Sequence, residues 1–208
     1  MARLRPLLWL GPLGLALWLF WTHPPDVLWA ERAQAPSERL QEVYTRLHPA
    51  VVQVQDGEGG RGTAFFYAPR LLLTAYHVVA EGGPFALLLA DGRRVEARVM
   101  GFHEPFDLAV LEAVGEAAPR TLPLELSRPP RVGEALLHIG NGRGQFLAPR
   151  YGRVTRLGAS PSPFLPPGLV ETSLPLAPGD SGGPVLDAAG RALGVAVAIG
   201  QTEEGFRS

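Results

Sequence analysis

Cysteine is absent from the 208-residue chain. Without a thiol, the protein cannot contain a disulfide scaffold, a cysteine nucleophile, a cysteine-ligated metal or an iron–sulfur cluster. Lysine is absent as well, because all 19 basic residues are arginine, and the 20 acidic residues leave a formal net charge of −1. Nucleic-acid-binding domains usually carry a basic excess, so we expect no nucleic-acid partner. No His-Glu-x-x-His motif occurs, and we expect neither a metal nor a cofactor.

Long apolar runs are scarce, and the one that is present opens the chain. Two arginines precede an apolar stretch over residues 7–21, and Trp18 and Trp21 stand at its far end. A basic start followed by an apolar stretch is typical of an export signal, and indole rings favour the membrane interface. We therefore expect residues 1–23 to form a hydrophobic signal or anchor helix, with the rest of the chain exported.

The fate of this segment depends on cleavage. An uncleaved segment would anchor the protein in a membrane, facing the periplasm or the cell exterior. Cleavage at a small-x-small sequence such as Ala33-Gln34-Ala35 would make the protein secreted. A buried core helix is the third alternative. Residues 24–47 are predicted to be a proline-containing linker and a short helix, in which Leu40, Val43 and Leu47 share one face.

The remaining chain carries no long helical pattern. Its apolar runs are short, β-branched or alternating, and 25 glycines and 21 prolines spread along the sequence supply turns between them. A hairpin is predicted around Asp91-Gly92. This spacing favours an all-β protein, either barrels or a sandwich. The predicted strands cover residues 51–54, 63–67, 71–74, 85–89, 95–99, 108–111, 135–139, 151–157, 169–173, 184–186 and 193–199.

The sequence Pro-Gly-Asp-Ser-Gly-Gly-Pro at residues 178–184 points to a nucleophile. A reactive serine needs a tight turn that exposes its hydroxyl, and backbone N–H groups that converge on a developing oxyanion. The flanking glycines permit the backbone angles of such a turn. We expect Ser181 to be the nucleophile and the N–H groups of Gly179 and Ser181 to form the oxyanion hole. A glycine-rich hairpin turn without catalytic function is the alternative.

Two further residues complete a possible catalytic set. His77 follows an apolar strand, and histidine is the usual general base near neutral pH. Asp107 leads into the apolar run 108–111, where a partly buried carboxylate would need a partner such as an imidazole N–H. Taken alone, each residue is as readily structural. The chain order His77, Asp107, Ser181 is that of chymotrypsin-type triads, and the three together predict a catalytic triad.

The chain from about residue 48 onward resembles the trypsin-like serine peptidases, specifically their HtrA/Deg branch. Residues 73–79 look like that branch's Leu-Thr-Asn-Asn-His-Val-Val, and residues 178–181 look like its Pro-Gly-Asn-Ser. The other segments that carry the resemblance are residues 49–52, 61–65, 91–93, 107–111, 140–141, 170–172 and 194–199.

This resemblance implies two packed antiparallel β-barrels of the trypsin-like type, with the triad at their junction. It implies a first barrel over residues 48–118, a connector over 119–131 and a second barrel over 132–208. The implied activity is that of a serine endopeptidase, acting outside the cytoplasm on unfolded or damaged proteins. The implied partners are a protein or peptide substrate, and the membrane through the N-terminal segment. The branch often trimerises through N-terminal residues, so a homotrimer is also compatible with the sequence.

Four features depart from the branch. The resemblance covers the protease domain, and no PDZ domain follows in this sequence. Ala75-Tyr76 replaces two asparagines before His77, and the loop over residues 142–149 is short and rich in glycine. Asp180 stands where the branch usually has asparagine. In zymogen-activated peptidases an aspartate there pairs with a newly cut N-terminus, but no Ile-Val-Gly-Gly activation sequence is visible, so the sequence leaves the partner of Asp180 open.

The residues expected around the substrate are apolar. We expect Leu176 and the strand residues Ala196, Val197 and Ala198 to line the pocket for the side chain before the cleaved bond, called P1. Pro175, six residues before the serine, occupies the position where an acid would favour arginine or lysine. We therefore predict small or medium aliphatic P1 residues, namely valine, alanine or leucine.

Two other functions use the same residues. A non-enzymatic binding or chaperone module on a peptidase fold would be marked by loss of a triad residue, and none is lost. An esterase or other acyl hydrolase would use the same site chemistry, and a comparison of amide with ester substrates would separate it from a peptidase.

Overall fold

The computed structural model describes residues 38–57, 59–159, 168–197, 200–202 and 205–207. The predicted signal or anchor helix over residues 1–23 lies outside the described residues. Within the described ranges, no helix is both long enough and apolar enough to cross a membrane.

The described chain begins with the helix α3 (Glu38–Leu47). Its buried side chains are Leu40, Val43 and Leu47, in agreement with the predicted apolar face. The α-helix gives way to the short 3₁₀-helix η1 (His48–Ala50), which contains Pro49. Proline removes an N–H donor and disfavours the helical conformation of the residue before it, so α3 ends here.

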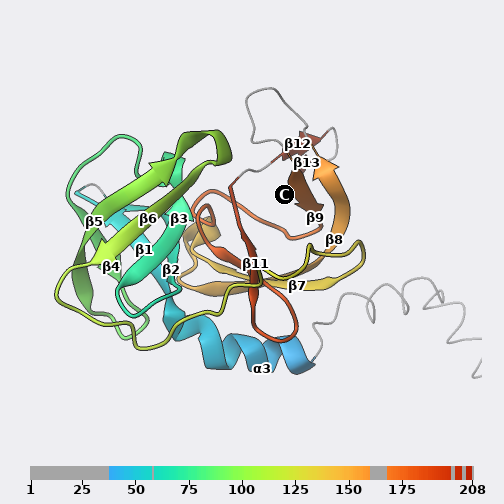
Figure 1. The fold of residues 1–208 in the computed structure, drawn as a ribbon, viewed down its shortest axis with the longest axis horizontal. Helices are drawn as coiled ribbons and strands as arrows, with labels where there is room; N and C mark the ends of the chain where they lie inside the picture. Colours follow the sequence, from blue (N-terminus) through green and yellow to red (C-terminus); the bar gives the residue numbers. More distant parts are fainter. Residues whose placement is uncertain (1–37, 58, 160–167, 198–199, 203–204, 208) are drawn as a thin grey trace, which may run out of the picture. The chain divides into compact units, whose positions relative to one another are not determined.

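Six antiparallel strands form a closed barrel, and this confirms the first of the two predicted barrels. Their order around the barrel is β1-β2-β3-β6-β5-β4, and Figure 1 shows them together on the left. Alternate residues along the strands point inward and fill the barrel with apolar side chains. The strands are β1 (Val51–Asp56), β2 (Gly59–Phe66), β3 (Leu71–Ala75), β4 (Phe85–Leu88), β5 (Arg94–His103) and β6 (Leu108–Ala113).

The predicted Asp91-Gly92 hairpin is confirmed. Strands β4 and β5 pair in antiparallel register, with Leu88 opposite Arg94. Gly92 has φ = +86°, a conformation that glycine adopts without a steric cost. The Asp91 carboxylate accepts a hydrogen bond from the Arg93 N–H at 3.0 Å and so stabilises the turn.

The second half of the chain forms an open five-stranded sheet in the order β11-β10-β7-β8-β9. A separate two-stranded ribbon pairs β12 with β13. The all-β prediction is therefore correct, but the second predicted barrel is not closed among the described strands. These strands are β7 (Ala135–Gly140), β8 (Ala148–Ala159), β9 (Leu169–Thr172), β10 (Pro184–Leu186), β11 (Ala192–Val195), β12 (Gly200–Thr202) and β13 (Gly205–Arg207).

Backbone pairing explains why the last strand of this sheet is shorter than predicted. The strand predicted over residues 193–199 ends at Val195 in the structure. The next residue, Ala196, bonds instead to the turn that follows the serine, accepting from Gly182 N at 2.7 Å and donating to Gly183 O at 2.9 Å. Its hydrogen-bonding groups are thereby used by the turn rather than by another strand.

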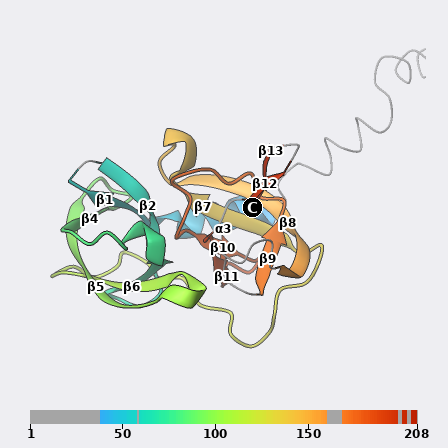
Figure 2. The same ribbon diagram turned by 90° about the horizontal axis from the view of Figure 1, so that it is seen from above.

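One apolar cluster contains residues of both halves. Val51 of β1 and Phe65 of β2 pack with Leu137 and Ile139 of β7, and the buried side chains of α3 belong to the same cluster. The views in Figures 1 and 2 agree that α3 lies against the second sheet. The connector touches both halves, because Leu122 N donates to Phe66 O at 2.8 Å and Glu125 N donates to Ala192 O at 2.9 Å. The interior of the protein is therefore continuous across the junction.

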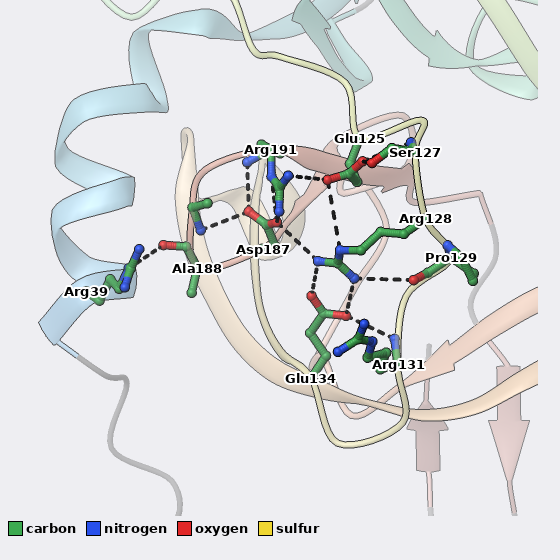
Figure 3. A network of polar contacts seen from close by, with 11 residues as sticks. Arg39, Glu125, Ser127, Arg128, Pro129, Arg131, Glu134, Asp187, Ala188 and Arg191 are labelled. Atoms are coloured by element: carbon green, nitrogen blue, oxygen red, sulfur yellow. Dashed lines mark hydrogen bonds and ion pairs between the residues drawn. The ribbon is translucent and has the colours of Figure 1, made fainter.

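A network of charged side chains fixes the connector to the β10–β11 turn (Figure 3). Arg128 pairs with Glu134 at 2.6 Å and with Asp187 at 3.3 Å. Arg191 pairs with Asp187 at 2.9 Å and also with Glu125. Asp187 is only 3% exposed, and its carboxylate also accepts the N–H groups of Ala189 and Arg191. Such a buried carboxylate is stabilising only while these partners are in place.

Stability is therefore expected to fall in acid. Burial raises the pKa of Asp187, but the N–H and guanidinium of Arg191 outweigh it and lower that pKa; the Arg128 guanidinium lowers the pKa of Glu134. Because the folded-state values lie below the unfolded ones, this stabilisation is present above about pH 4.5 and is lost as the pH falls through the folded values. Urea unfolding between about pH 7 and pH 3 measures this loss.

Asp187→Asn is expected to be less stable than the original chain at neutral pH and to lose less stability on acidification. The control is Glu42→Gln, at an exposed position on α3. An Asp187→Asn variant with the acid dependence of the original chain would contradict the assignment.

Candidate active site

Strand pairing brings His77 and Asp107 together. In β3 and β6, Ala75 lies opposite Leu108, so the residues just beyond the pair are neighbours. His77 lies in the short helix η2 (Tyr76–Val78), and Asp107 ends the short helix η3 (Glu104–Phe106). Tyr76 N donates to Asp107 O at 3.0 Å, which continues the β3–β6 pairing past the strand ends.

The Asp107 carboxylate makes two hydrogen bonds to His77. Its Oδ1 accepts the backbone N–H at 2.8 Å, and its Oδ2 lies 2.6 Å from the ring Nδ1. An ionised carboxylate only accepts, so Nδ1 carries the shared proton and Nε2 of a neutral ring is left as an acceptor. Tyr76, the residue before His77 in η2, stacks on Phe102 of β5 with ring centroids 4.5 Å apart. This contact holds the same helix from a second strand. The orientation of His77 is therefore fixed from two sides.

Ser181 lies on a turn that is bonded to the first barrel. Thr63 of β2 donates its N–H to Ser181 O at 2.8 Å and its hydroxyl to Gly179 O at 2.7 Å. The Thr74 hydroxyl donates to Thr63 O at 2.7 Å, and Asn141 Nδ2 donates to Thr63 Oγ1 at 2.9 Å. Thr63 and Thr74 are completely buried. These bonds hold the turn between the two halves of the molecule.

Close packing also brings Ser181 near the helix that carries His77. A Cβ added to Gly62 would lie 2.8 Å from a Val78 methyl and 3.0 Å from Ser181 O. A Cβ added to Gly182 would lie 2.1 Å from Thr63 O, 2.3 Å from Thr74 Oγ1 and 3.0 Å from Ala75 N. Among the described residues, no hydrogen bond joins the Ser181 hydroxyl to the His77 ring.

Two backbone donors on this turn are open. Gly179 has φ = +100° and approaches Asn141 so closely that an added Cβ would lie 2.6 Å from its carbonyl oxygen. Within the described part of the chain, the N–H groups of Gly179 and Ser181 donate to no other group. An arrangement of this kind can receive a negatively charged oxygen.

The predicted substrate residues fall into three groups. Leu176 and Ala196 are buried in the core of the second sheet, 6% and 7% exposed. Val197 is half-buried and packs against the core of the first barrel. Ala198 lies outside the described residues. In the ranges that the structure describes, no cluster of three histidine, aspartate or glutamate side chains could hold a metal ion.

The structure supplies the partners of Asp180 that the sequence left open. Its buried carboxylate accepts Gly142 N at 2.8 Å and Ala177 N at 3.0 Å, and it lies beside His138 and Arg150. These two basic side chains were not identified from the sequence, because neither stands in a recognisable motif. The need of a buried aspartate for a counter-charge was the only available sign.

Comparison with known proteins assigns the family. The model of the trypsin-like peptidase domain matches residues 62–195, a range that contains His77, Asp107 and Ser181. This chain belongs to the trypsin-like peptidase family. Its curated relatives include HhoA of Synechocystis sp. strain PCC 6803, named as a serine protease, which is 33% identical over 77% of this chain and 42% of the relative. A protein of Pseudomonas fluorescens named as a DegP-like periplasmic serine endoprotease is 31% identical over 88% of this chain and 40% of its own length.

Solved structures of HtrA-type proteases are similar to this chain as well. The HtrA-type protease AlgW with a decapeptide superposes with a TM-score of 0.72 at 25% identity, over 81% of this chain and 61% of that one. The chain spans less than half the length of these two curated relatives. The peptidase domain is thus the part that this chain has in common with them.

The tight packing at Gly182 yields a prediction for this peptidase fold. Gly182→Ala places a Cβ against Thr63 and Thr74 at φ = +85°. We expect the free energy of unfolding to fall by about 2 to 4 kcal/mol. Chemical denaturation of the full-length chain measures it. Gly194→Ala is the control, because its added Cβ meets nothing within 4 Å, and it should change stability by less than about 1 kcal/mol. Equal stability of the two variants would contradict this account of the turn.

Proposed function

We propose that this chain is a serine endopeptidase that hydrolyses peptide bonds in unfolded or damaged proteins outside the cytoplasm. The observation that carries the proposal is the doubly hydrogen-bonded Asp107–His77 pair beside the Ser181 turn. A carboxylate that fixes an imidazole next to a serine on a tight glycine turn is the arrangement that activates a hydroxyl as a nucleophile.

The proposal gives each of these residues a defined role. Ser181 Oγ attacks the carbonyl carbon of the substrate while His77 Nε2 removes the hydroxyl proton. Asp107 keeps the proton on Nδ1 and stabilises the imidazolium that forms. The N–H groups of Gly179 and Ser181 bind the developing oxyanion. His77 then protonates the leaving amine, and water hydrolyses the acyl-enzyme by the same steps.

The location and the substrate class rest on related proteins and on the sequence. Relatives named as periplasmic endoproteases support export, as does the predicted signal or anchor over residues 1–23. The structural neighbour AlgW is described with a decapeptide and with a tripeptide, which supports a peptide as the substrate. Membrane anchoring and a homotrimer stay predictions, as do the five segment boundaries given by the sequence.

The nucleophile is tested with a fluorophosphonate probe and with casein as an unfolded substrate. The full-length chain should be labelled, and Ser181→Ala should abolish the label and lower turnover about 10⁶-fold. Ser127→Ala, a serine of the connector network, is the matched control and should be labelled like the original chain. If a folded Ser181→Ala variant kept its activity, the mechanism would be wrong. A folded original chain that is never labelled would favour a binding module instead.

The apolar surroundings of the turn predict the substrate preference. Buried Leu174, Leu176 and Ala196 offer no charge to a P1 side chain. We expect a peptide library cleaved by the full-length chain to show valine, alanine or leucine at P1. The same library incubated with the Ser181→Ala variant identifies any cleavage by contaminating proteases. A profile dominated by P1 arginine would overturn this expectation.

A further inference from the structure

Asp180 connects the two proposed oxyanion donors, because it lies between Gly179 and Ser181 in the chain. Its side chain points into the protein and is completely buried. The space around the carboxylate is shaped by glycines: a Cβ on Gly140 would lie 2.3 Å from Oδ1, and a Cβ on Gly142 would lie 2.3 Å from Oδ2. The carboxylate therefore fills a pocket formed where β7 ends and the loop after it begins.

Hydrogen bonds accepted by this carboxylate join the start of the Ser181 turn to the loop after β7. Oδ1 accepts Gly142 N at 2.8 Å, outside the turn, and Oδ2 accepts Ala177 N at 3.0 Å, at its start. The backbone of Asp180 donates to Ala177 O at 2.9 Å and accepts from Gly183 N at 3.0 Å. Any movement of the carboxylate out of its pocket would thus move Gly179 and Ser181 with it.

Two basic side chains, one guanidinium and one imidazole, face this carboxylate from a single cross-strand pair. His138 of β7 lies directly opposite Arg150 of β8. The Arg150 Nε lies 3.7 Å from Asp180 Oδ2, and its NH2 donates to Gly142 O at 3.0 Å. The His138 Nε2 lies 3.5 Å from Asp180 Oδ1. Arg150 is 8% exposed and His138 is completely buried, so water has little access to either side chain.

The buried nitrogens of Arg150 and His138 that face Asp180 have no other acceptor in the described segments. Among the described residues, the Arg150 Nε and both ring nitrogens of His138 make no hydrogen bond, and Asp180 is the acidic side chain in contact with them. Burial raises the pKa of Asp180, but the neighbouring His138 ring and the N–H groups of Gly142 and Ala177 outweigh it and lower that pKa. The carboxylate is therefore ionised at neutral pH and requires a positive charge nearby.

We infer that Arg150 is a positioning residue of the active site: with His138 opposite, it supplies the buried positive charge that keeps Asp180 in its pocket and thereby aims the Gly179 and Ser181 N–H groups. The inference rests on the proposed function. Without the guanidinium, the ionised carboxylate loses a buried counter-charge, and the turn shifts away from the geometry that binds an oxyanion.

The test compares Arg150→Met with Arg153→Met in the full-length chain. Arg153 lies on the same strand, but it is exposed and donates to Gly133 O at 2.9 Å. The measurement is the second-order rate constant of fluorophosphonate labelling at Ser181, together with the final extent of labelling. Loss of an oxyanion donor typically lowers turnover by about 10² to 10³. We expect Arg150→Met to lower the rate constant about 100-fold and to be labelled to completion, while Arg153→Met matches the original chain.

A role limited to stability has a different signature. It would lower the final extent of labelling or the unfolding temperature but leave the rate constant of the folded fraction unchanged. That result would overturn the inference. For a peptide substrate we expect kcat to fall with KM nearly constant, because the oxyanion contact forms in the transition state.

A second background tests whether Arg150 acts through Asp180. In an Asp180→Asn background no buried carboxylate charge needs a partner, so adding Arg150→Met should lower the labelling rate constant less than about threefold, compared with about 100-fold in the original chain. Equal costs in both backgrounds would show that Arg150 does not act through Asp180. If instead the original chain were folded but never labelled, the proposed function itself would fail, which separates the two outcomes.

Discussion

The Ser181 turn is bonded to a strand of the opposite half of the molecule, and the rest of the site depends on that attachment. Thr63 of β2 uses both its N–H and its hydroxyl for the turn, while Thr74 and Asn141 occupy its remaining polar groups. Since Thr63, Thr74 and Asn141 are buried, breaking one of their bonds would leave an unsatisfied polar atom in the core. Ser181 from one half and His77 from the other are therefore brought together by the same buried atoms that join the halves.

Much of the fold and of the site could be predicted from short sequence patterns. The apolar spacing of Leu40, Val43 and Leu47 predicted the buried face of α3, and Asp91-Gly92 predicted a hairpin, because local geometry decides both. The proximity of His77 and Asp107 was predicted from chemistry, since a carboxylate that leads into an apolar strand needs a donor. The first two causes lie within a few residues of the pattern, whereas the His77–Asp107 contact also needs the register of β3 and β6.

The features that were missed depend on contacts between distant segments. The predicted strand over residues 193–199 stops at Val195 because Ala196 bonds to the catalytic turn, and nothing in its own sequence encodes that partner. The positions of His138 and Arg150 beside Asp180 follow from the register of β7 and β8, which a single sequence does not reveal. The connector network also depends on a contact between distant segments, because Arg128 lies on the connector and Asp187 on the β10–β11 turn.

The location of Arg150 on β8 has a consequence for when the active site becomes ordered. Peptidases that obtain the counter-charge of this aspartate from a newly cut chain end stay dormant until they are cut. Arg150 is part of strand β8, so a counter-charge that Arg150 supplies is in place once the domain has folded. The Ser181 turn would then be ordered as soon as the domain has folded. Folding, rather than a proteolytic cut, would set the start of its activity.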